Sequence, residues 1–223
     1  MQERFLRGCR ADPAARLTLE RVSNAGGGIL WPAMSRPGLL LFLAFFTAAA
    51  GGQTASDLLY QPYVGQPGKD VIWVPTPPAL VEKMLDMARV TPKDFVMDLG
   101  SGDGRNIIAA AKRGARGLGV EYDADLVRLS QQTAAREGVG HLARFVGGDM
   151  YEADISQATV LALFLLPENL ARLRPKFEKL KPGSRIVTHG YAIPGWTATE
   201  VRSAEADCGS WCEAYLYVVP AQD

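Results

Sequence analysis

A glycine-rich turn is the first feature of this sequence whose residue types and spacing are suited to chemistry. It reads Asp98-Leu99-Gly100-Ser101-Gly102-Asp103-Gly104 and follows the apolar residues 95–97. Glycine lets the backbone adopt positive φ and approach a ligand closely. A dinucleotide-binding turn has the spacing G-x-G-x-x-G and holds a pyrophosphate, whereas here the third glycine comes one residue earlier and Asp103 adds a carboxylate. Because a carboxylate repels pyrophosphate, this turn, with Asp98 beside it, predicts a site for a cationic ligand.

Two further carboxylates follow the next predicted strands. Glu121 lies 21 residues after Gly100, at the end of a predicted strand, and its carboxylate can accept hydrogen bonds from both ribose hydroxyls. Asp149 is suited to accept a hydrogen bond from an adenine amino group. An adenosine joined to a positively charged amino acid matches all of these carboxylates. We therefore predict S-adenosylmethionine as the cofactor, with the neighbouring Tyr122 and Met150 as further contacts; a purely structural role for the turn, Glu121 and Asp149 is the alternative.

Strands and helices alternate along residues 56–223, as the spacing of apolar residues and turn formers predicts. We expect strands at 95–99, 117–121, 143–147, 159–164, 185–189 and 214–219. We expect helices that begin at Thr76, as N-cap, and near Asn106, Asp123 and Pro167. This alternation predicts an α/β fold with a doubly wound, mostly parallel sheet and an antiparallel terminal strand. In such a sheet the carboxyl ends of the strands bring the turn and the two carboxylates to one edge.

The turn Asp98–Gly104 together with Glu121 resembles the class I S-adenosylmethionine-dependent methyltransferases. A narrower resemblance covers about residues 60–219. Its motifs are Tyr63-Val64, Val74-Pro75-Thr76-Pro77, Asp98–Arg105, Leu163–Pro167 and Trp196. These motifs resemble the protein-lysine methyltransferases of the ADP/ATP translocase and the ATP synthase c subunit, and their bacterial relatives. The resemblance implies a Rossmann-like seven-stranded sheet, a protein substrate with a lysine acceptor, and Thr76 as a cofactor contact. One departure from the pattern is an insertion, residues 65–73, which we expect to change the acceptor-side surface.

An apolar segment after the fourth predicted strand is expected to face the methyl acceptor, as the resemblance implies. Leu165, Leu166 and Pro167 would form an acceptor-side wall, where desolvation lowers the pKa of a lysine from about 10.4 and favours the neutral amine. Glu168 is a candidate to orient the amine, although a carboxylate at a helix start also interacts favourably with the helix dipole. His189 is either a base or a buried histidine with satisfied hydrogen bonds. We assign no general base.

Composition and charge narrow the function classes. The 223 residues include 24 basic and 24 acidic side chains, so no electrostatic attraction to nucleic acid is expected. His141 and His189 are not at zinc-motif spacing, so we predict no metal site. A nicotinamide-dependent oxidoreductase would need a later third glycine and no Asp103. That oxidoreductase and a non-catalytic S-adenosylmethionine-binding protein are the alternatives to a methyltransferase.

Residues 1–55 are expected to form an extension ahead of the methyltransferase domain, residues 56–223. Residues 39–50 are almost wholly apolar and end in three alanines, so the segment 34–50 resembles a secretory signal with an A-x-A cleavage site. The run is shorter than the roughly 20 residues that span a bilayer, and an uncleaved anchor that associates with the membrane is the alternative. Export of the domain conflicts with a cofactor made in the cytosol.

The start of the chain and two cysteines bear on whether the domain is exported. Met34 lies just before the apolar run and is an alternative start to Met1. Cys208 and Cys212 lie four residues apart and would form a disulfide in an exported domain, or remain thiols in a reducing compartment.

Overall fold

The computed structural model describes residues 60–204 and 211–221. The extension 1–55, its apolar segment 34–50 and Cys208 lie outside the described residues, and their predictions stay predictions. Within the described ranges, no helix is long and apolar enough to cross a membrane.

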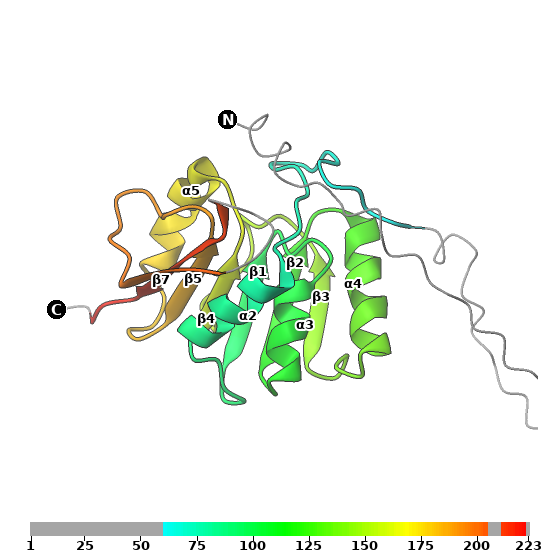
Figure 1. Ribbon diagram of the computed structural model, residues 1–223, viewed down its shortest axis with the longest axis horizontal. Helices are drawn as coiled ribbons and strands as arrows, with labels where there is room; N and C mark the ends of the chain where they lie inside the picture. The colour runs from blue at the N-terminus through cyan, green and yellow to red at the C-terminus, as the bar shows by residue number, and fades with distance from the viewer. Residues whose placement is uncertain (1–59, 205–210, 222–223) are drawn as a thin grey trace, which may run out of the picture.

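Seven strands form one sheet, in the order β3-β2-β1-β4-β5-β7-β6 (Figure 1). Their bounds are β1 Phe95–Leu99, β2 Arg116–Glu121, β3 Ala143–Gly147, β4 Val160–Leu163, β5 Arg185–His189, β6 Glu200–Ser203 and β7 Glu213–Val218. The first five strands pair in parallel, and β7 is antiparallel to both β5 and β6. The predicted doubly wound, mostly parallel seven-stranded sheet with an antiparallel terminal strand is thus confirmed.

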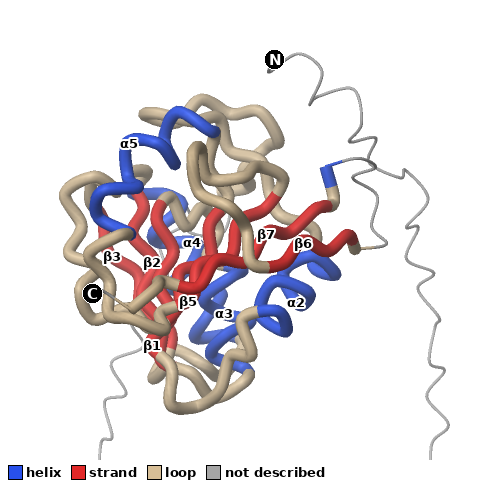
Figure 2. The backbone as a smooth tube through the Cα atoms, turned by 90° about the vertical axis from the view of Figure 1, so that its left-hand side faces the viewer, coloured by secondary structure: helices blue, strands red, loops and turns tan. Residues whose placement is uncertain are grey.

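Four helices of eight or more residues cover the sheet within the described ranges. They are α2 Pro78–Met87, α3 Arg105–Lys112, α4 Ala124–Arg136 and α5 Pro167–Phe177. Alternate strand residues separate two cores: Val96 and Val160 pack with residues of α2 and α3, whereas Met97 and Leu161 pack with residues of α5. Figure 2 shows α2 and α3 side by side along one side of the sheet. Burial on both faces explains why the central strands are almost continuously apolar.

The starts of three helices test the predicted caps. Asp123 caps α4 as expected, because its side chain accepts hydrogen bonds from the backbone N–H groups of residues 125 and 126. Pro167 opens α5, also as expected. The expected N-cap at Thr76 is wrong by one residue: Pro77 occupies that position in α2 without a side-chain cap. The Thr76 hydroxyl instead lies 3.1 Å from Nδ1 of His189.

The turn between β1 and α3 needs glycine at its last position. Gly104 is the N-cap of α3 with φ of 82°. A Cβ there would lie 2.6 Å from the Phe145 ring and 2.9 Å from Cβ of Ser130. Both the left-handed backbone and the close approach to β3 and α4 therefore exclude a larger residue.

Candidate active site

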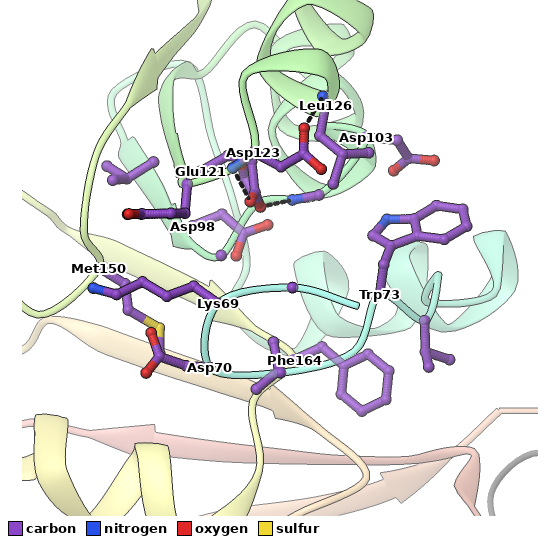
Figure 3. A pocket seen from close by; sticks show the side chains of 18 of the residues that line it. Lys69, Asp70, Trp73, Asp98, Asp103, Glu121, Asp123, Leu126, Met150 and Phe164 are labelled. Carbon is purple, nitrogen blue, oxygen red and sulfur yellow. Dashed lines mark hydrogen bonds between the residues drawn. The ribbon is translucent and has the colours of Figure 1, made fainter. Parts of the chain in front are cut away.

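One cavity lies at the carboxyl ends of β1, β2 and β3 (Figure 3). The predicted cofactor contacts that line it are Thr76, Asp98, Gly100, Ser101, Gly102, Asp103, Glu121, Tyr122, Asp149 and Met150. Gly104 does not line it, because this glycine packs against Phe145. The parallel topology thus brings together residues that are up to 74 positions apart in the sequence.

Asp98 lies in the cavity wall near the end of β1 and is only 3% exposed. Its Oδ2 accepts a hydrogen bond from Nδ2 of Asn106 at 3.0 Å. Its Oδ1 is buried and has no hydrogen-bond partner among the described residues. Burial raises the pKa of Asp98 well above its usual range. The hydrogen bond from Asn106 lowers this pKa, whereas the negative charges of Glu121 and Asp103 raise it further. Such a carboxylate is suited to a cationic donor, which would satisfy Oδ1 and hold the group ionised.

Glu121 is fixed by two backbone donors at the end of β2. Its Oε2 accepts from Gly102 N at 2.8 Å, and its Oε1 accepts from Asp123 N at 2.9 Å. Each carboxylate oxygen has a further lone pair. The side chain can therefore accept two more hydrogen bonds from neighbouring hydroxyls without moving.

Asp103 forms an ion pair with Arg105, a partner that the sequence pattern does not predict, and its role as a cofactor contact stays a prediction. Arg105 donates to it from Nε at 2.9 Å and forms an ion pair at 2.5 Å. Arg105 also donates from NH1 to the carbonyl oxygen of Thr76 at 2.6 Å. Asp103 therefore positions an arginine that ties Thr76 to the glycine turn, and Asp98 is the turn carboxylate with an oxygen left for a cation.

Asp149 is engaged by a lysine from the insertion. Lys69 Nζ lies 2.5 Å from Oδ2 of Asp149, and Tyr151 N donates to Oδ1 at 2.9 Å. The same ammonium group lies 4.8 Å from the centre of the Tyr122 ring. These hydrogen bonds, first of all the one from Lys69, hold the pKa of Asp149 below its usual range.

None of the four residues predicted as the acceptor-side wall, Leu165–Glu168, lines this cavity. Leu165 is 1% exposed, and its side chain reaches within 3.4 Å of where a Cβ on Gly100 would lie. Leu166 is the N-cap of α5 and Pro167 its first residue, whereas Glu168 lies in the first turn. The residue just before them, Phe164, does line the cavity, although it was not among the predicted wall residues. The acceptor-side roles of residues 165–168 remain predictions.

His189 is a buried histidine with both ring nitrogens engaged. It is 2% exposed, and its Nε2 lies 3.0 Å from the carbonyl oxygen of Trp211. A carbonyl only accepts, so Nε2 carries the proton and Nδ1 accepts from the Thr76 hydroxyl. Burial lowers the pKa of His189 to about 4, and its ring centre lies 3.8 Å from that of Phe164. The geometry fits the satisfied-histidine interpretation, with neither nitrogen available as a base at neutral pH.

Several cavity residues were not singled out from the sequence. They are Lys69, Trp73, Arg105, Asn106 and Phe164. Arg105 and Phe164 lie inside quoted motifs, and Asn106 is the buried residue eight positions after Asp98 that donates to its carboxylate. The sequence predicts that the insertion at residues 65–73 shapes the acceptor side. The structure places residues 66–73 in the wall of the same cavity as Glu121 and Asp149.

Comparison with known proteins identifies relatives of this arrangement. Residues 98–200 match the family described as the ANTKMT methyltransferase domain. A protein-lysine N-methyltransferase of Saccharolobus islandicus (strain REY15A) is 43% identical over 152 residues, which are 67% of this chain and 94% of that protein. The human lysine N-methyltransferase of the ATP synthase c subunit is 33% identical over 60% of this chain and 58% of its own length. A crystal structure of an RNA methyltransferase from Salinibacter ruber in complex with S-adenosyl-L-homocysteine is 41% identical, with a TM-score of 0.63 over 67% of this chain and 96% of that one.

Proposed function

Because this chain belongs to the ANTKMT family of S-adenosylmethionine-dependent methyltransferases, we propose that its methyl acceptor is a lysine side chain of a protein. The cofactor is S-adenosylmethionine, and the family membership sets aside the nicotinamide-dependent oxidoreductase. The lysine acceptor is supported by the 43% identity to a protein-lysine N-methyltransferase of which this chain covers 94%.

The cavity has the donors and acceptors that this cofactor needs. The single observation that carries the fit is the buried, unpartnered Oδ1 of Asp98, which suits the ammonium group of the amino-acid end. Glu121, with both oxygens pre-oriented by backbone donors, accepts from the ribose hydroxyls. Tyr122, Asp149 and Met150 then lie toward the adenine end. When bound, the cofactor supplies a methyl group on a positively charged sulfur.

The protein's own part in the reaction is alignment and control of protonation. An amine must be neutral to accept a methyl group, and a lysine in water has a pKa of about 10.4. Phe164 and the apolar residues 165–167 lie at the end of β4, where they would desolvate the acceptor and favour its neutral form. His189 is committed to Thr76 and Trp211, so we assign it no base role and propose desolvation as the source of the neutral amine.

A second acceptor class is RNA, because the Salinibacter ruber relative is described as an RNA methyltransferase. Charge argues against RNA for this chain. Residues 56–223 carry 21 acidic and 18 basic side chains, whereas RNA binding needs an excess of positive charge.

The experiment supplies methyl-labelled S-adenosylmethionine to the purified protein together with a cell lysate. We expect label in material that protease digests and nuclease does not. Label lost on nuclease treatment would assign the acceptor to RNA. Binding of the cofactor without transfer to any fraction would favour the non-catalytic binding protein.

A further inference from the structure

The insertion at residues 65–73 forms a closed loop over the cavity, which we call the strap. Gly65 N donates to the carbonyl oxygen of Trp73 at 2.9 Å, and Trp73 N donates to that of Gln66 at 3.0 Å. These two hydrogen bonds hold the two ends of the strap next to each other. Figure 3 shows it crossing the cavity opposite Asp98 and Glu121.

The strap contacts the turns after three successive strands. At one end, the indole nitrogen of Trp73 lies 2.8 Å from where a Cβ on Gly102, after β1, would be. Farther along, Lys69 Nζ lies 4.8 Å from the centre of the Tyr122 ring, after β2. The same atom forms the 2.5 Å ion pair with Asp149, after β3. A loop held at these points spans the whole row of proposed cofactor contacts.

We propose that the strap is a clasp that retains the cofactor, with the Lys69–Asp149 ion pair as its latch. Trp73 anchors the strap on the glycine turn, while the latch closes it at the adenine end. Exchange of the product for fresh S-adenosylmethionine then requires the ion pair to break. This inference concerns the cofactor side alone, so it goes beyond the proposed lysine acceptor and does not depend on it.

The latch makes a limited contribution because it is partly exposed. The Lys69 side chain is 36% exposed and that of Asp149 is 25% exposed. Ion pairs of this kind contribute little and are screened by salt. We expect a change of a few-fold in cofactor release, with a marked dependence on ionic strength.

The test replaces Lys69 and measures binding of S-adenosylhomocysteine without any acceptor. Lys69→Met keeps the aliphatic length and removes the charge, so the dissociation rate should rise about 2- to 5-fold and the dissociation constant should increase by a similar factor. Lys69→Arg should retain the wild-type values. Added salt should speed dissociation from the wild type and leave the Lys69→Met rate nearly constant.

A matched control removes a similar ion pair elsewhere. Lys112 Nζ, at the end of α3, lies 2.9 Å from the Glu137 carboxylate, and neither residue lines the cavity. Lys112→Met should leave the rate of cofactor dissociation unchanged. An unchanged rate for Lys69→Met would overturn the proposal, as would tighter binding, which would mean that Lys69 competes with the cofactor for Asp149. Absence of lysine methylation by the wild type would leave this result untouched and would count only against the proposed acceptor.

Discussion

At the scale of single residues, the burial of Asp98 has two opposite effects, one on ligand binding and one on stability. Its unpartnered, buried oxygen suits a cationic cofactor, and the same burial raises its pKa well above that of an unfolded aspartate, about 3.9. A group with a raised folded-state pKa destabilises the fold as pH increases above the unfolded pKa, until it passes the folded one. We therefore expect the apo protein to lose stability as the pH rises above the unfolded pKa of Asp98, which is the cost of the cofactor contact proposed for it.

Asp98→Asn should separate these two effects. The amide can still accept from Asn106, so the apo variant should melt above the wild type at neutral pH. Leaving a buried polar group without a hydrogen-bond partner costs about 1–3 kcal/mol, which corresponds to roughly 2–12 °C at this chain length. The difference should vanish below pH of about 3.9. Saturating S-adenosylhomocysteine should stabilise the wild type much more than the variant; equal melting temperatures with and without ligand in both proteins would contradict this role for Asp98.

Glu121 should matter for cofactor affinity. Loss of a charged hydrogen-bond acceptor costs about 1.5–3 kcal/mol, so Glu121→Ala should weaken cofactor binding roughly 10- to 150-fold by calorimetric titration. Glu137→Ala removes a carboxylate of the exposed Lys112 pair and provides the control. A dissociation constant that is the same in both variants would move the ribose site away from β2.

At the scale of elements, the turn between β1 and α3 sets how closely α3 and α4 approach the sheet. Gly104→Ala combines a strained φ of 82° with a Cβ placed 2.6 Å from Phe145. We expect a loss of about 2–4 kcal/mol in the free energy of unfolding, measured with urea. Gly138→Ala is the matched control, because its φ of 73° is similar and nothing lies within 4 Å of the new Cβ. That variant should lose only about 1 kcal/mol; equal losses would mean that packing at Gly104 contributes nothing.

Strands with a clear run of apolar residues were predicted accurately, and a strand without one was not. β1, β3 and β5 have the predicted bounds because each is a short run between clear turn residues. β6 was not located, since it is an edge strand of exposed and half-exposed residues with no apolar run. Its place beside β7 depends on a tertiary contact that local sequence does not encode.

The sequence predicts a site residue when its place at the end of a strand is enough to bring it to the cavity. Asp98, Glu121 and Asp149 lie at or just after the ends of predicted strands, and a parallel sheet brings such ends together. Partnerships were not predictable: Arg105 neutralises Asp103, and Lys69 reaches Asp149 from 80 positions away. Both depend on side-chain conformations and on the path of the strap, which have no local periodic signal.

At the scale of the whole molecule, the extension 1–55 is a separate question from the fold. The apolar residues 39–50 and the alanines at 48–50 predict cleavage after Ala50. Amino-terminal sequencing of the protein from its native host should then find Gly51 first. A mature chain that begins at Met1 or Met34 would contradict cleavage and favour the anchor.

At the scale of the whole molecule, the cavity proposed to hold the cofactor is bounded by the strap, the glycine turn and Phe164 after β4, and the central claim is that the methyl acceptor is a protein lysine. The most direct measurement is tandem mass spectrometry of protein from the labelled lysate, after incubation with S-adenosylmethionine and either wild type or Glu121→Ala. We expect one or more added methyl groups on lysine side chains with the wild type, and strongly reduced methylation with the variant. Methyl groups found only on arginine, on carboxylates or on RNA would contradict the lysine acceptor.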